Sequence, residues 1–255
     1  MKHTTGEITA LMGQNDPHPD HALYMIAAEL TAHPDADLIY TDEDKIDELG
    51  RRYDPYFKPD WNYELFLSQN CFSHLGVFET SLVRDVGGFR EGLEGSQDWD
   101  LALRCCERLG ASEIGHLPKV LYHWRAIPGS TALAVGEKSY AVTAGERAVS
   151  EHLARVGAKG RVLSTEWGHH RLQYDVPLPA PKVSLIVPTR DRVSLLKLCV
   201  DSILERTTYP DYEILIVDNQ STEPETGQYL QEVARDPRVR VLDYDAPSNY
   251  SAINN

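Results

Sequence analysis

The pattern of hydrophobic and polar positions changes once along the chain, near residue 182. Before that point, short apolar runs that are typical of strands alternate with segments whose apolar residues recur every three or four positions, as in helices. The runs predict strands at 6–12, 38–40, 71–78 and 114–120, and the spacing predicts helices at 22–32 and 99–109. The acidic run 41–47 is expected to form a loop.

Residues 137–156 are predicted to form an amphipathic helix, because their apolar side chains recur at helical spacing. Two glycines, Gly157 and Gly160, are expected to end it. The stretch from these glycines to Pro181 carries three prolines and is predicted to be an extended connector.

From residue 182 the order becomes strand, helix, strand, helix, strand. The strands are expected at 183–188, 213–218 and 239–242, and the helices at 194–206 and 224–235. A capping box at 222–225 is expected to start the second of these helices. Continuously apolar strands joined by helices predict an α/β fold with a parallel sheet that is covered on both faces.

Polar residues follow two of these strands at the same edge of the predicted sheet. Thr189, Arg190 and Asp191 follow the first strand, and Asp218 follows the second. Ligands of parallel sheets bind at the carboxyl ends of the strands, so we expect a ligand here. No glycine-rich phosphate loop follows either strand, which disfavours an NAD site or a P-loop.

Charge and composition narrow the function class. The 255 residues include 25 Lys and Arg against 39 Asp and Glu, a formal net charge of −14, which argues against a nucleic-acid partner. The four cysteines have no CxxC spacing and are expected to be reduced structural thiols. We found neither an apolar run of the ~18 residues that a membrane helix needs nor a secretory signal. We therefore expect a cytoplasmic protein, which could still be peripheral to the inner membrane through partners.

Seven segments together resemble a known enzyme family. The first half of a family-two glycosyltransferase of the GT-A fold is similar to segments 183–191, 214–222 and 249–255. The second half of such an enzyme is similar to segments 57–61, 86–90, 95–101 and 121–125. The resemblance implies an α/β fold of GT-A type, with a parallel or mixed sheet and flanking helices, present as two complementary partial domains.

The two halves come in reverse order, since the nucleotide-binding half precedes the acceptor half in the family. The resemblance implies a C-terminal, metal- and acceptor-binding half at 6–133, a helical and Pro-rich connector at 134–181, and an N-terminal, nucleotide-binding half at 182–255. This order is similar to tandem polysaccharide glycosyltransferases, and a fragment of such a protein is expected. Alternatively, the halves could complete one sheet within one chain or through self-association of two.

The resemblance implies inverting transfer of a sugar from a nucleotide-diphosphate sugar to a hydroxyl of a glycan or lipid-linked glycan acceptor. Asp98 corresponds to the general base that deprotonates this hydroxyl; a helix N-cap is the structural alternative. The acceptor or phosphate is expected at Gln97, Trp99, Trp124 and Arg125, with core packing as the alternative for Trp124. The nucleotide is expected at Pro188, Thr189, Arg190, Asp191 and Asp218.

A divalent cation, Mg²⁺ or Mn²⁺, is also implied by the resemblance, but its Asp-x-Asp motif is altered here. The two Asp positions carry Gly13 and Asn15. The expected ligands are therefore Asn15, Asp16 and His123, and the prediction of a metal is weaker because an Asn offers an oxygen ligand without a charge. His123 could equally be a buried, hydrogen-bonded histidine. The run 42–44 also matches Asp-x-Asp, but acidic loops of this kind are usually only solvated.

Two other function classes stay open. One is a catalytically inactive or truncated module that acts as a scaffold or binding domain. The other is a nucleotidyltransferase, which shares the parallel nucleotide-binding sheet but lacks motifs like those at 97–100 and 122–125.

Overall fold

The computed structural model describes residues 3–127, 139–165 and 168–254. The chain divides into two compact units, Met1–Asp175 and Val176–Asn255. Both units combine sheets with flanking helices, which confirms the predicted α/β class. Within the described ranges, no helix has the length and apolar character needed to span a membrane.

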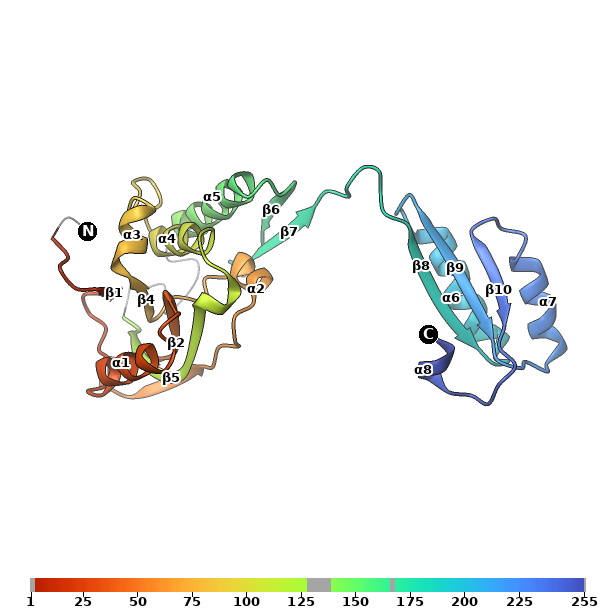
Figure 1. The fold of residues 1–255 in the computed structure, drawn as a ribbon, viewed down its shortest axis with the longest axis horizontal. Coiled ribbons are helices and arrows are strands. Elements are labelled where there is room, and N and C mark those ends of the chain that lie inside the picture. Colours follow the sequence, from red (N-terminus) through yellow and green to blue (C-terminus); the bar gives the residue numbers. More distant parts are fainter. Residues whose placement is uncertain (1–2, 128–138, 166–167, 255) are drawn as a thin grey trace. The chain divides into compact units, whose positions relative to one another are not determined.

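The first unit is built on a mixed five-stranded sheet (Figure 1). Its long central strand β2 (Leu38–Ile46) pairs in antiparallel fashion with β4 (Gly76–Glu79) and β3 (Arg52–Tyr56). Strand β5 (Ile114–Arg125) runs parallel to β2, and the short strand β1 (Ile8–Ala10) extends the sheet beyond β4.

Apolar residues on the two faces of this sheet enter two separate cores. On β2, Ile39 faces the core that includes Ala22 and Ile26 of helix α1 (Ala22–Ala32). The neighbouring Leu38 and Tyr40 face the larger core of the other side. That core is closed by the helices α2 (Tyr63–Ser68), α3 (Thr80–Asp85), α4 (Gln97–Cys106) and α5 (Ser139–Arg155). A single 3₁₀ turn, Ala111–Glu113, leads into β5.

The acidic run 41–47, expected as a loop, is mostly part of β2, so that expectation was wrong. The run is tolerated in a buried strand because its side chains have partners inside the sheet. Asp42 Oδ1 lies 2.9 Å from His116 Nε2, and Asp44 Oδ1 lies 2.6 Å from His123 Nδ1. Paired polar groups of this kind cost far less to bury than isolated ones.

The expected strand at 71–78 is shorter than predicted, since β4 begins at Gly76. The residues before it form a turn that is held from outside the strand. Lys58 Nζ donates to the His74 carbonyl over 2.8 Å, and Leu75 N donates to Thr41 Oγ1 over 3.3 Å. The turn places Ser73 and His74 beside a cavity that is described below.

The predicted helix within the connector is α5, which packs against α4 in the first unit (Figure 1). Its apolar stripe, Ala144, Ala148, Val149 and Leu153, is buried in the larger core. The segment expected to be extended forms an antiparallel hairpin of β6 (Gly160–Ser164) and β7 (His170–Tyr174). Both α5 and this hairpin therefore lie within the first unit, Met1–Asp175.

Parts of the predicted boundaries fall outside the described residues. These are the junction at 133–134, the first two positions of the helix at 137–156, and residue 255 of the segment 249–255.

The second unit is a three-stranded parallel sheet in the order β10, β9, β8. Its elements follow the predicted alternation and are β8 (Val183–Thr189), α6 (Val193–Arg206), β9 (Tyr212–Asp218), α7 (Pro224–Val233) and β10 (Val239–Asp243), followed by the short helix α8 (Tyr250–Ile253). Both α6 and α7 share one core with Ile214 and Ile216 of β9.

The prediction that this sheet is covered on both faces was wrong for the described chain. On the open face, Ile186 of β8 pairs in register with Leu215 of β9, and Leu242 of β10 pairs with Val217. Ile186 is 43% exposed and Leu242 is 37% exposed. The predicted capping box is also not formed, since the N-cap of α7 is Glu223 without a side-chain cap. Pro224 does begin the helix, as predicted.

All four cysteines carry free thiols, as predicted. Cys71 and Cys105 are buried, and burial raises the pKa of Cys71 to about 11 and of Cys105 to about 12. A thiol with such a pKa stays protonated and unreactive near neutral pH.

Candidate functional site

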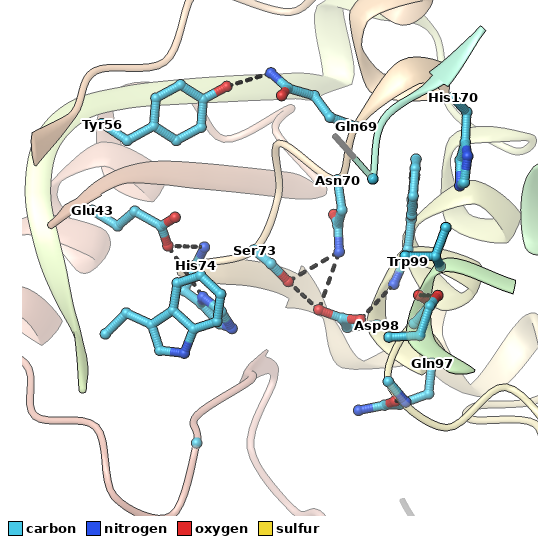
Figure 2. Close-up of a pocket in the computed structure, with 17 residues that line it drawn as sticks. Glu43, Tyr56, Gln69, Asn70, Ser73, His74, Gln97, Asp98, Trp99 and His170 are labelled. Atoms are coloured by element: carbon cyan, nitrogen blue, oxygen red, sulfur yellow. Dashed lines mark hydrogen bonds and ion pairs between the residues drawn. The ribbon is translucent and has the colours of Figure 1, made fainter. Parts of the chain in front are cut away.

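A cavity of about 520 Å³ opens in the first unit where the sheet meets the start of α4 (Figure 2). Its wall is formed by Glu43 on β2, Tyr56 on β3, the turn with Ser73 and His74, and Asp98 at the start of α4. Ala141, Val142, Gly168 and His170, from the segment predicted as a connector, complete the wall. Its volume lies in the range of about 300–1,000 Å³ that is common for small-molecule sites.

Asp98 is half-buried at this cavity and is held by three neighbours (Figure 2). Its Oδ2 accepts hydrogen bonds from Ser73 Oγ and from Asn70 Nδ2, the latter over 3.1 Å. Its Oδ1 accepts from its neighbour's backbone N–H, Trp99 N, over 2.9 Å. These bonds fix the carboxylate at the cavity. The helix N-cap is Ser96, so Asp98 does not take the N-cap position that was its structural alternative.

The start of α4 is fixed by its contact with α5. Ser96 Oγ donates to the Ala141 carbonyl over 2.8 Å. Gly95 has a φ of +89°, and a Cβ atom there would lie 2.7 Å from Ala141 Cβ, so this position requires glycine. Gln97 lines the same cavity, and its Oε1 accepts from Gly95 N over 2.7 Å. The α5 helix thus helps to set the direction in which Asp98 points.

The opposite wall is held by a buried lysine and a buried glutamate. Glu43 is 8% exposed, and its Oε2 accepts from His74 N and lies 3.1 Å from His74 Nδ1. Lys58, which belongs to the motif at 57–61, is 5% exposed, and burial lowers the pKa of its ammonium. Because Lys58 and Glu43 both hold the His74 backbone, they position the turn that carries Ser73.

The two tryptophans predicted to contact the acceptor, Trp99 and Trp124, differ in their surroundings. Trp99 is 5% exposed, and its indole N–H donates to the Phe66 carbonyl over 3.0 Å, so it is mainly a core residue with one edge at the cavity. Trp124 is half-buried, packs against His74 with ring centroids 5.2 Å apart, and lines the cavity.

Arg125 lies with Asn15 and Asp16, which were predicted as metal ligands. Its Nε donates to the Asn15 carbonyl over 2.7 Å, and its backbone N–H donates to Asp16 Oδ1 over 2.8 Å. The other carboxylate oxygen of Asp16 accepts from Tyr122 Oη. These three residues therefore brace the segment after β1 against the end of β5.

The predicted metal ligands do not fit a divalent cation. Both oxygens of Asp16 already accept hydrogen bonds, and His123 Nδ1 pairs with Asp44. Asp44 Oδ2 also accepts from Arg52 Nε over 2.6 Å, which leaves the run 42–44 committed to the sheet. Across the described ranges, no three His, Cys, Asp or Glu side chains come together as a metal site.

The position of Gly13 explains why an aspartate cannot replace it without rearrangement. A Cβ atom at Gly13 would lie 2.2 Å from Asp16 Oδ2 and 3.0 Å from Tyr122 Oη. The Gly13 backbone N–H donates to the same Tyr122 Oη over 3.1 Å. Glycine at this position therefore allows the close contact between the segment after β1 and β5.

The second unit carries a separate cavity of about 360 Å³ at the carboxyl ends of its strands. Three of the predicted nucleotide residues, Pro188, Thr189 and Arg190, line it together with Asn219 and Tyr250. Asn219, which follows Asp218 at the predicted ligand edge, was given no role of its own from the sequence. It is 2% exposed, and its Oδ1 has no hydrogen-bond partner among the described atoms.

Asp191 and Asp218 are engaged beside this cavity rather than among its lining residues. Asp191 Oδ1 accepts from the backbone N–H groups of Thr222 and Glu223, each over 2.8 Å, and so caps α7. The hydrogen bond from Glu223 is the main reason why the pKa of the Asp191 carboxyl is lowered. Asp218 Oδ1 accepts from Ser221 N over 3.1 Å.

Several cavity residues were missed by sequence reasoning. Glu43 was considered only within an acidic loop, and Asn70, Ser73 and His170 were not considered at all. The polar residues between 68 and 74, which interrupt an otherwise apolar stretch, were the available signal for Asn70 and Ser73. We see no sequence signal for His170.

Comparisons with known proteins give relatives over nearly the whole chain. The chain is 48% identical over 254 residues to the uncharacterized protein y4gI of Sinorhizobium fredii, and 43% identical over 250 residues to the O-antigen biosynthesis protein RfbC of Myxococcus xanthus. Each alignment covers 98% of this chain but only 28% of y4gI and 19% of RfbC. The chain thus spans less than a third of the length of either relative.

Two crystal structures of S. aureus TarS 1–349 are similar to parts of the chain. The complex with UDP aligns with a TM-score of 0.38 at 16% identity and covers 60% of this chain and 48% of that one. The other structure aligns with a TM-score of 0.39 at 14% identity and covers 71% and 75%.

The match to a known family lies in the second unit. Residues 184–252, from β8 to α8, match the sequence profile described as glycosyl transferase family 2. This is the segment that contains the cavity at the carboxyl ends of the strands. The segment 184–252 of this chain is therefore similar to glycosyl transferase family 2.

Proposed function

We propose that the chain is part of a glycosyltransferase that moves a sugar from a nucleotide-diphosphate sugar to a hydroxyl of a surface glycan. The family match of residues 184–252 supports the transfer chemistry, and the likeness to an O-antigen biosynthesis protein supports a polysaccharide acceptor. The observation that carries the proposal is the carboxylate of Asp98, held at a 520 Å³ cavity by Ser73 and Asn70.

Asp98 is the general base in this proposal. Its carboxylate takes the proton of the acceptor hydroxyl while the hydroxyl oxygen attacks the anomeric carbon. The bond from that carbon to the diphosphate oxygen breaks, and the nucleoside diphosphate leaves with the bonding electrons. This direct displacement inverts the configuration of the sugar. The hydrogen bonds to Ser73 and Asn70 hold the carboxylate where a bound hydroxyl would lie.

The nucleotide belongs to the cavity of the second unit, where Pro188, Thr189, Arg190 and Asn219 are its contacts in this proposal. The unpartnered Oδ1 of Asn219 suits an N–H donor, such as one on a nucleobase. Asp191 and Asp218 act indirectly, because they hold the turns around this cavity.

The two units are complementary halves of transferase domains in this proposal, as the domain prediction had it. The missing half of each is supplied by a second copy of the chain in this proposal, so the chain itself can be tested for turnover. The open face of the second unit's sheet, with Ile186 and Leu242 exposed, supports an additional partner there.

A turnover measurement tests the function. The chain is incubated with UDP-, dTDP- and GDP-sugars and with neutral oligosaccharides from bacterial surface polysaccharides, and release of nucleoside diphosphate is followed. We expect release that depends on the oligosaccharide and falls by about 10²–10⁴-fold in Asp98→Asn, the usual contribution of a general base. Release that Asp98→Asn leaves unchanged would contradict the assignment of the base.

One observation favours a second candidate, a glycan-binding module without catalysis. Gly13 and Asn15 replace the acidic residues that hold the cation in related transferases, and the remaining ligands are committed elsewhere. This candidate predicts glycan binding at the cavity with no release of nucleoside diphosphate for any donor.

A further inference from the structure

A second cavity adjoins the candidate acceptor cavity in the first unit. It measures about 330 Å³ and shares four lining residues with the larger cavity, namely Glu43, Tyr56, Gln69 and Trp124. Of these two cavities, the second alone is lined by Asp44, Lys45, Asp54 and Pro55, and the first alone by Asp98. In Figure 2, Glu43 and Tyr56 lie on the opposite side of the view from Asp98.

One face of the sheet forms the floor of the second cavity. Glu43 and Lys45 alternate along β2 and so share a face. Glu43 pairs in register with Tyr56 of β3, and Lys45 pairs with Trp124 of β5. Residues paired in register point to the same side of a sheet, so two aromatic rings flank a carboxylate and an ammonium.

The charges of this cavity favour a neutral ligand. Lys45 Nζ lies 2.7 Å from Asp54 Oδ2, which neutralises the one cation among the described lining residues. A phosphate or an acidic sugar would face Glu43 and Asp44 as well as Asp54. An anion is therefore disfavoured.

The lining groups match the chemistry of a sugar ring. Tyr56 and Trp124 offer flat apolar surfaces, which suit the C–H faces of a sugar. Gln69 has both donor and acceptor atoms, and Lys45 has N–H donors beyond the one directed at Asp54. Hydroxyl groups can use both kinds of partner.

On the basis of the proposed function, we propose that the second cavity binds the sugar residue that precedes the reacting residue of the acceptor. The acceptor is then a neutral oligosaccharide of at least two residues. The terminal hydroxyl of this oligosaccharide lies at Asp98. From there the oligosaccharide passes Glu43 and Trp124 toward Lys45 and Asp54.

Two matched substitutions in one hairpin test this inference. Lys45→Ala removes an ion-paired cation from the second cavity. Arg51→Ala removes one from the turn between β2 and β3, where Arg51 Nε lies 2.7 Å from Asp47 Oδ2 and contacts neither cavity. Binding of the 255-residue chain is measured by titration with neutral bacterial-polysaccharide fragments of one, two, three and four residues.

We expect the trisaccharide to bind at least tenfold more tightly than the monosaccharide. Lys45→Ala should weaken trisaccharide binding by about tenfold, the effect of losing a charged hydrogen-bonding group, while Arg51→Ala binds like the natural chain. Equal affinities for one and three residues, an unaffected Lys45→Ala variant, or no binding of any fragment would each overturn the inference.

The turnover measurement separates this inference from the proposed function. If fragments of one and three residues bind equally but release of nucleoside diphosphate still requires Asp98, the function stands and the second subsite is wrong. If Asp98→Asn changes nothing in turnover while Lys45→Ala still weakens binding of longer fragments, the glycan subsite stands and the catalytic assignment is wrong.

Discussion

The indole ring of Trp99 stacks on the imidazole ring of His170, with centroids 5.1 Å apart and planes 10° from parallel. Trp99 follows Asp98 directly in α4, whereas His170 belongs to β7. The stack therefore ties the hairpin of β6 and β7 to the turn that presents the candidate base. His170 is 2% exposed, and burial lowers the pKa of its imidazole.

His170 should make the first unit less stable as the pH falls. In the unfolded chain the imidazole takes up a proton below its ordinary pKa of 6.5, but the buried ring in the folded unit resists protonation. The stabilisation is full above pH 6.5 and is lost as the pH falls below it. His170→Phe keeps an aromatic stack without a titrating group, so its stability should fall less than that of the natural chain between pH 7 and 5. Urea unfolding at several pH values measures this difference.

The control is His170→Ala, which should be less stable at every pH because it removes the stack, a contact worth about 0.5–1.5 kcal/mol beyond burial. Equal pH slopes for the natural chain and His170→Phe would show that His170 does not carry the effect.

A pair of glycine substitutions tests how tightly α5 approaches the same stack. A Cβ atom at Gly145 would lie 2.9 Å from His170 Nε2 and 3.0 Å from Trp99 Cζ3, so Gly145→Ala should destabilise the first unit by about 1–3 kcal/mol. Gly227 of α7 has nothing within 4 Å, so Gly227→Ala should stabilise the second unit by about 1 kcal/mol through better helix propensity.

Fluorescence can tell the two units apart in this test, because all four tryptophans lie in the first 175 residues. Tryptophan emission should report the loss in Gly145→Ala, and hydrogen exchange at α7 should report the gain in Gly227→Ala. A stabilised Gly145→Ala variant would contradict the close approach of α5 to Trp99.

The sequence predicted the elements well where the reason for them is local. The helix at 22–32 and the alternation after residue 182 follow from periodicity alone, and α1 has the predicted bounds. The run 41–47 was misjudged because its partners His116 and His123 lie more than seventy residues away. A local pattern cannot show that a histidine on a strand far along the chain will pair with an acidic residue and allow its burial.

The candidate site was also predicted where its signal is local and missed where it depends on residues far apart in the sequence. Asp98 was found through a motif, but Ser73 and Asn70 hold it from 25 and 28 residues away. The apolar stripe of α5 showed that the helix needs a partner without showing that α4 is that partner. The connector was therefore separated from the cavity that it helps to form.

Asp98 and Asp100 should respond differently to the same substitution. Asp100 is fully buried and accepts hydrogen bonds from Arg90 and Arg104, which lower the pKa of its carboxyl although burial opposes them. Asp100→Asn should cost about 3–5 kcal/mol, the loss expected when one member of a buried ionic group is removed. Asp98→Asn should leave the unfolding midpoint nearly unchanged while it lowers turnover.

Urea unfolding of both variants measures this contrast. Equal losses of stability would show that Asp98 is a structural residue like Asp100, and the proposed role in catalysis would then fail.

Asp16 should behave as a structural residue and not as a metal ligand. Its carboxylate accepts hydrogen bonds from Tyr122 Oη and Arg125 N, so Asp16→Ala should destabilise the first unit by about 1–3 kcal/mol, the cost of leaving buried donors without a partner. Addition of Mn²⁺ or EDTA should move the melting temperature of neither the natural chain nor the variant. A rise in melting temperature with Mn²⁺ that disappears in Asp16→Ala would restore Asp16 as a ligand.

Asp191 should make the second unit sensitive to acid. Backbone hydrogen bonds from Glu223 and Thr222 lower the pKa of this carboxyl below its ordinary 3.8. The stabilisation is present above that value, because the carboxylate is ionised in both states there, and it is lost as the pH falls through the lowered pKa. Asp191→Asn keeps an acceptor oxygen without the charge, so its second unit should lose less stability than the natural one between pH 6 and 3. Hydrogen exchange of the α7 amides, compared at the two pH values, measures this. An identical acid response in both proteins would mean that the cap on α7 does not depend on the charge of Asp191.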